Sequence, residues 1–416
     1  MTQFQINKYL SLKLENGKTN IYVNGSLFHQ CKFLLLQIPV KQMTLLSDMG
    51  SIDEVADQLD KSLEQGVNVV SRIPPEVEFW GHCSNLQVWY ENGYNTSLLH
   101  SNLAFPLLKR LVDVGDQNAK DVFKEEIIRR LESGYYPVIY YLIKENYTTY
   151  IERQDLFYSI LVPEEAEIIL KLERNLDIEF QIDFTKENLE WVKSSISFQN
   201  KRVIRLQLVG HGLESVPESI KQLNVLKYLY LNGNDFKSLP EWIGDYKDLE
   251  ILSLRSCDLE QIPESIGNLK RLNVLNLVNN YLTELPISIG NLANLKELNC
   301  GNNELIRLPK SIGSLKNLEE LYLNENVIKE LPDTLGNLSN LKNLILTLNK
   351  LQFFPETIRF LINLESLKID GNYFKSLPSF LLELPNLKKV AINTNLMKTI
   401  SDDMKKQLDS RHIYIE

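Results

Sequence analysis

Residues 272–292 read LNVLNLVNNYLTELPISIGNL, and this stretch is one copy of a unit that recurs nine times. The first residue of the copy has an equivalent every 23 residues, with no insertion between copies. The equivalent positions are Val203, Leu226, Leu249, Leu272, Leu295, Leu318, Leu341, Leu364 and Leu387. Because these copies occupy about half of the 416 residues, the rest of the chain has to be interpreted around them.

Each copy follows the pattern L-x-x-L-x-L-x-x-N/C-x-L, which is typical of a leucine-rich repeat solenoid. Leu272, Leu275 and Leu277 alternate with polar neighbours along a short strand, and Leu282 and Leu285 continue the apolar set through the return. A single 23-residue turn cannot bury these side chains, so the core forms only when turns stack. We therefore expect an α/β leucine-rich repeat solenoid with nine strands in one parallel, concave sheet.

The ninth position of each repeat is nearly always asparagine. A buried amide there can bond the backbone groups left unpaired where the chain leaves the strand, and stacked copies then form a ladder. We assign this structural role to His211, Asn234, Cys257, Asn280, Asn303, Asn326, Asn349, Asn372 and Asn395. Histidine and cysteine are substitutes with partial hydrogen-bonding ability.

The second half of the repeat has the form LP-x-x-I-G-x-L, with a proline in eight copies and Ile or Leu three residues later. In this form the array from Val203 to Ile400 resembles the intracellular leucine-rich repeat proteins of the Ras-associated group, which include the Ras suppressor, scaffolds that bind Ras-like GTPases and plant relatives. The resemblance implies a protein partner, with a Ras-like small GTPase as the first candidate, and recognition by the concave face.

The chain ahead of the array is expected to form an N-terminal, mostly helical α+β domain. Asn16-Gly17 and Asn24-Gly25 predict hairpin turns, and they place a small β-rich element over residues 1–45, with the apolar segment 31–40 included. Helical spacing follows from residue 51, so residues 46–178 are predicted as a helical domain. Residues 179–202 are expected to cap the array through a short helix near Leu189. The array spans 203–400, and 401–416 form the C-terminal cap, with a short strand at 412–415.

Composition and charge narrow the function. Residues 1–200 carry 19 basic and 28 acidic side chains, and residues 201–416 carry 26 of each. Neither half has the basic stripe that nucleic acid or an anionic membrane requires. No apolar run reaches the roughly 18 residues of a membrane span, and residues 1–18 lack the continuous apolar stretch that a signal peptide has. Four scattered cysteines favour a reducing compartment, so we expect a cytoplasmic protein.

Core positions are fixed by the fold, so any binding function of the array depends on the variable strand residues that line the concave face. Three patches stand out: an apolar and aromatic one over repeats two to four, an acidic one with a tyrosine over repeats five and six, and a small basic one formed by Lys368, Lys388 and Lys389. Such patches are typical of protein interfaces. The predicted partner-binding residues are Tyr228, Tyr230, Ile251, Val274, Val278, Glu297, Glu320, Tyr322 and Glu325. A different interpretation is that the N-terminal half covers this surface.

The sequence contains no phosphate-binding loop, zinc-protease helix, nucleophile elbow or kinase motif. His29-x-Cys31 and His82-Cys83 could supply four ligands to zinc, but their spacing is unlike that of structural zinc sites. A ubiquitin-ligase-like enzyme would need a catalytic cysteine, for which Cys83 is the candidate. We predict a protein-binding scaffold or adaptor in signal transduction, with no enzymatic activity, no cofactor and no metal. The alternative is that the N-terminal domain is the effector and the array only targets it.

Overall fold

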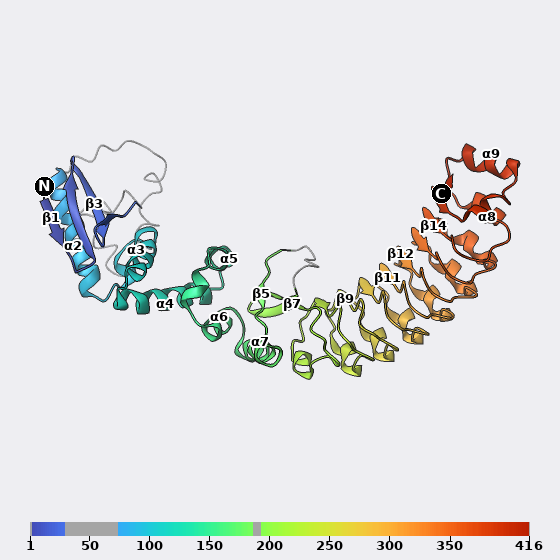
Figure 1. Ribbon diagram of the computed structural model, residues 1–416, viewed down its shortest axis with the longest axis horizontal. Coiled ribbons are helices and arrows are strands. Elements are labelled where there is room, and N and C mark those ends of the chain that lie inside the picture. Colours follow the sequence, from blue (N-terminus) through green and yellow to red (C-terminus); the bar gives the residue numbers. More distant parts are fainter. Residues whose placement is uncertain (1, 30–73, 186–192, 416) are drawn as a thin grey trace, which may run out of the picture. The chain divides into compact units, whose positions relative to one another are not determined.

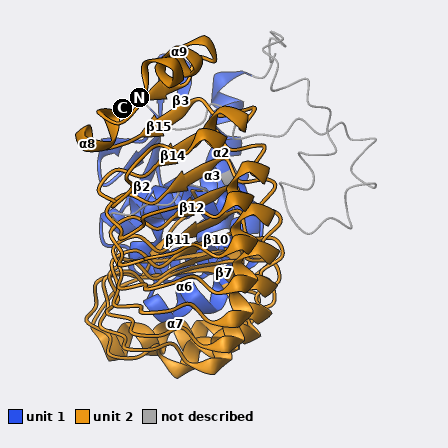
Figure 2. Cartoon of the chain, turned by 90° about the vertical axis from the view of Figure 1, so that its right-hand side faces the viewer, with its two compact units in different colours: residues 1–160 blue, residues 161–416 orange. Residues whose placement is uncertain are grey.

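The computed structural model describes residues 2–29, 74–185 and 193–415, and it divides the chain into two compact units, 1–160 and 161–416. Figure 2 colours these two units, which we call the N-terminal unit and the repeat unit. The division places residues 161–178 with the repeats, whereas the sequence analysis assigns them to the helical domain. The apolar segment 31–40, the helical pattern after residue 51 and the capping helix near residue 189 lie outside the described residues.

The N-terminal unit opens with a four-stranded antiparallel sheet in the order β1-β2-β3-β4. Its strands are β1 (Thr2–Gln5), β2 (Leu10–Glu15), β3 (Lys18–Val23) and β4 (Ser26–Leu27). Asn16 and Gly17 both have positive φ, 52° and 73°, as a two-residue hairpin turn requires. Asn24 and Gly25 do the same before β4, at 48° and 76°. Both predicted hairpins are present.

Helices follow the sheet. Helix α2 starts with a proline at its first turn and packs against β2 and β3, and the ring of Trp80 on α2 meets Phe4 of β1 edge-on at 5.8 Å. Among the described residues of this unit, the helices are α2 (Pro75–Glu91), η3 (Thr96–Leu98), α3 (Ser101–Asp113), α4 (Gln117–Glu132), α5 (Tyr136–Lys144), η4 (Tyr147–Tyr150) and α6 (Arg153–Ile160).

A buried polar contact joins the sheet of this unit to its helices. Tyr94, just after α2, donates its hydroxyl to Asp116 Oδ2 at 2.6 Å and accepts a hydrogen bond from Asn7 Nδ2 at 2.8 Å. The other oxygen of Asp116 accepts from the backbone N–H of Ala119 at 3.1 Å, which caps α4. One carboxylate therefore fixes three segments that are distant in sequence.

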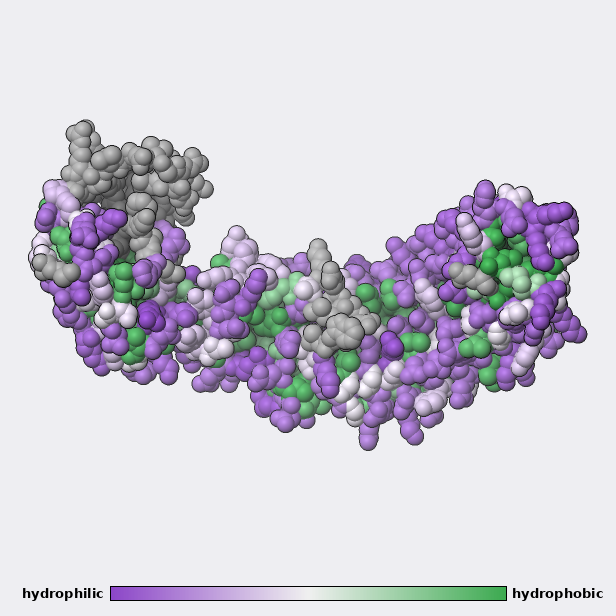
Figure 3. All heavy atoms as spheres, turned by 45° about the horizontal axis from the view of Figure 1, so that its top comes forward, coloured by the Kyte–Doolittle hydropathy of each residue, from purple (hydrophilic) through white to green (hydrophobic). Residues whose placement is uncertain are grey.

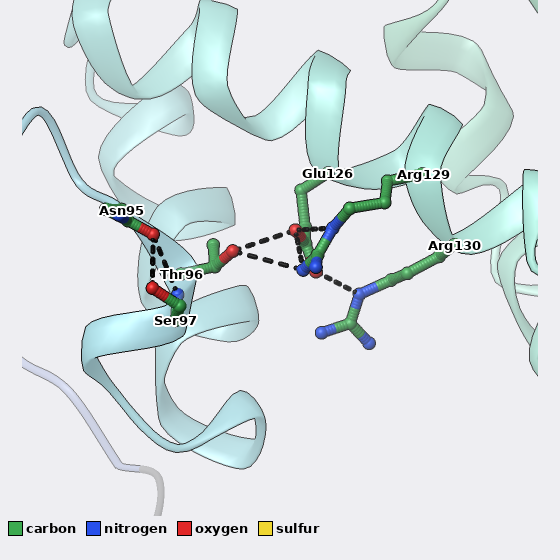
Figure 4. Close-up of polar contacts among 6 residues, drawn as sticks. All are labelled: Asn95, Thr96, Ser97, Glu126, Arg129 and Arg130. Atoms are coloured by element: carbon green, nitrogen blue, oxygen red, sulfur yellow. Dashed lines mark hydrogen bonds and ion pairs between the residues drawn. The ribbon is translucent and has the colours of Figure 1, made fainter. Parts of the chain in front are cut away.

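Glu126, in the middle of α4, organises a second buried cluster, shown in Figure 4. Its carboxylate is only 4% exposed. It accepts from Arg129 Nε at 3.0 Å, Arg130 Nε at 2.6 Å and Thr96 Oγ1 at 2.9 Å. The hydrogen bond to Thr96 ties α4 to η3, so the cluster holds two helical segments together.

The repeat unit begins with α7 (Pro163–Leu176), β5 (Gln181–Ile182), β6 (Ser194–Gln199) and β7 (Arg202–Leu208). Strands β6 and β7 form an antiparallel hairpin. The buried Glu165 of α7 accepts from Arg202 Nε and from the backbone N–H of Val203, both at 2.6 Å. Helix α7 and strand β6 thus bind β7, the first strand of the array.

The array repeats one strand and one 3₁₀ helix in every 23 residues (Figure 1). The further strands are β8 (Tyr228–Tyr230), β9 (Ile251–Ser253), β10 (Val274–Asn276), β11 (Glu297–Asn299), β12 (Glu320–Tyr322), β13 (Asn343–Ile345), β14 (Ser366–Lys368) and β15 (Lys389–Ala391). The 3₁₀ helices are η5 (Glu218–Gln222), η6 (Glu241–Asp245), η7 (Glu264–Asn268), η8 (Ile287–Asn291), η9 (Lys310–Ser314), η10 (Asp333–Asn337), η11 (Glu356–Phe360) and η12 (Ser379–Glu383).

The strands of the array pair in parallel from β7 onward, and equivalent residues of successive repeats face one another, as Leu275 and Leu298 do. Leu275 and Leu277 are fully buried. The sheet has 12 strands, from β5 to β16, and β6 with β7 is its antiparallel pair. The predicted leucine-rich repeat solenoid is confirmed.

The glycine of the LP-x-x-I-G-x-L form has a packing role. A Cβ on Gly290 would lie 2.4 Å from the backbone oxygen of Ser311 in the next repeat, closer than two such atoms can approach. Four other glycines meet the next repeat in the same way, namely Gly244, Gly267, Gly313 and Gly336. Glycine therefore lets neighbouring 3₁₀ helices stack closely.

The C-terminal cap consists of α8 (Thr394–Met397), α9 (Asp402–Ser410) and β16 (Tyr414–Ile415). Leu408 of α9 is buried. Strand β16 lies within the short strand predicted at 412–415, and it pairs in parallel with β15. The side chain of Asn393 accepts a hydrogen bond from the backbone N–H of Leu396 at 2.8 Å and so begins α8.

Candidate protein-binding face

The concave face of the repeat unit is formed by the outward side chains of the strands, at positions three, five and seven of each repeat. Parallel pairing in register places equivalent positions side by side, so that Val274, Glu297 and Glu320 come from three successive strands. Figure 2 shows these strands stacked as rungs. Each position thus forms a column, and the residues in a column determine what the face can bind.

The first strands of this face are covered by the segment that follows β5. Arg205 of β7 makes a buried ion pair with Asp183 Oδ2 at 2.9 Å and donates to the backbone oxygen of Thr185 at 3.2 Å. The same guanidinium lies 5.1 Å from the ring centroid of Tyr228. Tyr230 is only 3% exposed. The prediction that Tyr230 presents its ring to a partner is therefore wrong, because the ring is buried at the end of the face that residues 183–185 contact.

Tyr228, Ile251, Val274 and Val278 remain half-buried, with part of each side chain open to solvent. The hydroxyl of Tyr228 donates to Glu250 Oε2 at 3.4 Å. The apolar patch predicted over repeats two to four is therefore reduced to one edge of Tyr228 and three aliphatic side chains.

The acidic patch centres on Glu297 and Glu320, which are direct partners across β11 and β12. Both side chains are half-buried, and Tyr322 donates its hydroxyl to Glu320. Burial, and then the charge of Glu320, raise the pKa of Glu297. No lysine or arginine of the described chain makes an ion pair with either carboxylate. Like charges placed opposite one another destabilise a sheet. We therefore expect the repulsion between Glu297 and Glu320 to reduce the stability of the array, because no ion pair offsets it.

Neighbouring carboxylates in the array differ in this respect. Glu319 binds Lys342 Nζ and Glu365 binds Lys388 Nζ, each at 2.6 Å. The lysine in each case holds the pKa of the glutamate below its usual range. Glu325, the remaining predicted acidic residue, is exposed. The unbalanced negative charge therefore belongs to the concave columns.

The ninth-position residues form a buried asparagine ladder. Asn280 Nδ2 donates to the backbone oxygens of Leu254 and Leu277, both at 2.9 Å, and its Oδ1 accepts from the backbone of Cys257 and Leu259 at 3.0 Å. Equivalent side-chain contacts to neighbouring backbone occur at Asn234, Asn303, Asn326, Asn349 and Asn372. These amides are structural and are not available to a ligand.

Three members of the predicted ladder differ. Cys257 contacts two backbone oxygens through its Sγ, that of Leu231 at 3.1 Å and that of Arg255 at 3.5 Å. His211 lies at the first turn, where its ring pairs with Ser194 Oγ at 2.9 Å, so its side chain is outside the ladder. Asn395 is exposed within α8, because the chain turns into a helix after the last strand. The predicted ladder role is wrong for His211 and Asn395.

A second ladder, at position 23 of the repeat, was missed by the sequence analysis. Asn294 Nδ2 donates to the backbone oxygen of Lys270 in the preceding repeat at 2.7 Å. The same bond recurs at Asn317, Asn340, Asn363 and Asn386. Its signal was the asparagine that precedes the first leucine of five consecutive repeats.

The structure gives no support to catalysis by Cys83 or to a metal site among the described residues. Burial raises the pKa of the Cys83 thiol to about 11, which is the reverse of what activates a nucleophile. Cys31 of the considered zinc set lies outside the described residues. Across residues 2–29, 74–185 and 193–415, no three His, Cys, Asp or Glu side chains cluster as metal ligands would. In those ranges, no helix is long and apolar enough to cross a membrane.

A family model described as a leucine-rich repeat region matches residues 182–304 and 289–410. The chain belongs to the leucine-rich repeat family. A search of curated proteins gave no match. Among solved structures, a leucine-rich repeat protein of Leptospira interrogans is 31% identical over 58% of this chain and 67% of its own, with a TM-score of 0.42.

Two further solved structures are similar to parts of this chain. The plant peptide hormone receptor RGFR1, solved in complex with RGF2, is 31% identical over 51% of this chain and 34% of its own, with a TM-score of 0.42. TLR13, solved in complex with ssRNA13, is 25% identical over 46% of this chain and 32% of its own, with a TM-score of 0.41. The chain thus spans about a third of the length of each of these two proteins.

Proposed function

We propose that this leucine-rich repeat protein is a scaffold that binds a protein partner on the concave face of repeats three to six. The observation that carries the proposal is the pair Glu297 and Glu320, which is half-buried and makes no ion pair with a described residue. Stacking of the repeats does not require this pair, since the equivalent residues of other repeats are neutral or basic, as Val274 and Lys389 are. A basic side chain of a partner would neutralise it.

The surroundings of the acidic pair fit a protein interface. Tyr322 lies beside it, and Ile251, Val274 and Val278 supply a partly open apolar area on the preceding strands. Tyrosine and aliphatic groups bordered by charge are the usual composition of an interface core and its rim. Within the proposal, the apolar area provides affinity and the carboxylates select a partner with an exposed lysine or arginine.

A Ras-like small GTPase is the partner class that we propose, on the basis of the LP-x-x-I-G-x-L resemblance. We also place the protein in the cytoplasm. In support, Cys83, Cys257 and Cys300 are free and buried, as is usual in a reducing compartment.

The experiment measures binding of the purified full chain to a panel of Ras-like GTPases, each loaded with GDP or with a non-hydrolysable GTP analogue. The test variant combines Glu297→Gln, Glu320→Gln and Tyr322→Ala. The matched control is Glu365→Gln, which removes a carboxylate that already has a lysine partner. We expect the triple variant to weaken binding at least tenfold and the control to leave it within about twofold, because the control lies outside the open columns.

A photo-cross-linking amino acid at Val274, on the concave face, tests the scaffold role without assuming the partner class. A matched chain carries it at the exposed Asn291 of η8. Specific protein adducts from position 274 that are lost in the triple variant support the proposal. Equal adducts from both positions contradict it. Absence of binding across the GTPase panel, with specific adducts from position 274, rejects only the Ras-like partner.

A further inference from the structure

Repeat seven, residues 341–363, differs from the other repeats in what it exposes. Leu348 occupies position eight and Phe353 position thirteen, and their side chains are 53% and 62% exposed. Elsewhere position eight holds Gly, Ser, Asn, Glu or Thr, and position thirteen holds Ser, Gln, Glu, Arg or Thr. The repeat fold therefore does not require apolar residues at these positions.

Repeat eight continues this apolar area. Tyr373 is 61% exposed, and its backbone N–H donates to the oxygen of Leu351 in repeat seven at 2.8 Å. A Cβ on Gly371 would lie 2.6 Å from Leu348 Cδ2, so the Leu348 side chain rests on the glycine two residues before Tyr373. The loops after β13 and β14 thus bring Leu348 next to Tyr373.

Phe353 lies near the apolar area formed by Leu348 and Tyr373, because the next residue in the chain, Phe354, contacts repeat eight. Phe354, the next residue, stacks on Phe374 of repeat eight with ring centroids 4.8 Å apart and an interplanar angle of 16°. Phe374 directly follows Tyr373 and is partly exposed. We call the exposed set Leu348, Phe353, Tyr373 and Phe374 the apolar flank. Figure 3 shows hydrophobic surface among the hydrophilic surface at the C-terminal end of the array.

The charge of these loops changes where the apolar flank begins. Positions seven to thirteen of each repeat form the loop that follows the strand. In repeats three to six these loops carry three basic and six acidic residues, whereas in repeats seven and eight they carry Lys350, Lys375 and a single acid, Asp370. Asp370 accepts a hydrogen bond from Thr347 Oγ1 at 2.8 Å. Both lysines are exposed, and neither makes an ion pair with a described residue.

We propose that the apolar flank with Lys350 and Lys375 is a second docking surface, separate from the concave face, for an acidic amphipathic segment of a partner protein. Apolar side chains of that segment would cover Leu348, Tyr373 and Phe353, and its carboxylates would meet the two lysines. An exposed apolar patch bordered by polar and charged residues is typical of a protein interaction site. Charge complementarity determines the choice of an acidic partner over a basic one.

The test uses a random library of 12-residue peptides selected on the immobilised full chain, followed by fluorescence anisotropy of the selected peptides. The flank variant is Leu348→Ser, Phe353→Ser and Tyr373→Ser together. The matched control is Phe360→Ser with Ile362→Ser, which removes two equally exposed apolar residues of the same repeat in and after η11. Circular dichroism of each variant checks that the array is folded.

We expect selected peptides to be rich in Asp or Glu together with Leu, Phe or Trp. Their affinity should fall at least tenfold in the flank variant, several-fold in Lys350→Glu with Lys375→Glu, and within about twofold in the control. Selected peptides that lack acidic residues, or that bind the flank variant equally well, overturn the proposal. Sedimentation with phosphatidylserine vesicles that depends on the same three residues overturns it in favour of a lipid surface.

Discussion

The N-terminal unit and the repeat unit satisfy their buried polar groups in different ways. In the repeat unit one amide, such as Asn280, bonds the backbone of its own repeat and of the preceding one, and the solution is copied every 23 residues. In the N-terminal unit Asp116 and Glu126 each hold a group of contacts found once. The asparagine contacts of the repeat unit recur with a fixed period, so they can be recognised in the sequence. The contacts of Asp116 and Glu126 join residues without a fixed spacing, so they can be recognised only in the folded structure.

The largest expected effect comes from breaking the periodic core. Leu275→Asp places an unpaired charge between stacked layers where the leucine is fully buried. We expect it to lower the free energy of unfolding of the repeat unit by about 4 kcal/mol or more, measured by urea denaturation. The control is Asn276→Asp on the open side of the same strand, which should cost below about 1 kcal/mol. Equal stability of the two variants would contradict the register.

A second substitution tests the Glu126 cluster of the N-terminal unit, which has no counterpart in the repeats. Glu126→Ala removes the acceptor of Arg129, Arg130 and Thr96. We expect the free energy of unfolding of the N-terminal unit alone to fall by about 2–3 kcal/mol. Hydrogen exchange of the backbone amides of α3 and α4 measures this change. Protection of the repeat strands should not change, and Glu132→Ala at the exposed end of α4 serves as control. Loss of protection in both units together would show that they unfold as one.

The third prediction repairs the one interior ladder position that lacks an amide. The single S–H of Cys257 is shared between the backbone oxygens of Leu231 and Arg255, whereas an asparagine amide there could donate one hydrogen to each of two carbonyls, as Asn280 does. Cys257→Asn should therefore raise stability by about 1 kcal/mol, and Asn280→Cys should lower it by about the same amount. Thermal melting of both variants measures the difference. A loss of stability in Cys257→Asn would mean that the sulfur fills space that an amide cannot.

The smallest effect concerns the acidic pair. Burial and Glu320 raise the pKa of Glu297, so the folded chain holds this proton to a higher pH than the unfolded chain. Stability contributed by the protonated form is present at low pH and falls as pH rises through the folded pKa. Glu297→Gln should thus gain about 0.5 kcal/mol at neutral pH and nothing below the unfolded pKa of Glu, which denaturation at both pH values would detect. If Glu297→Gln changed the free energy of unfolding by the same amount at both pH values, the charge of Glu297 would not be the cause of the change.

The sequence allowed the array to be predicted almost completely, because its contacts join residues 23 apart and repeat. It did not predict the contact of Asn7 with Tyr94 and Asp116, which spans the N-terminal unit without any period. It also placed Tyr230 on the surface, since nothing in the repeat pattern shows that Asp183 reaches Arg205 from outside the array. In repeats three to six the variable strand residues, such as Ile251, Val274 and Glu297, keep part of their side chains open to solvent.

The position-23 ladder has a consequence for how such a chain can change its length. The Asn317 side chain bonds the residue 24 positions before it, and Asn340 does the same one repeat later. Loss or duplication of residues 295–317 as a block would give each remaining asparagine an equivalent carbonyl, because every repeat offers the same acceptor. Gain or loss of whole repeats thus preserves the bonding, whereas an insertion of any other length interrupts it. The ladder makes the repeat the natural unit of evolutionary insertion.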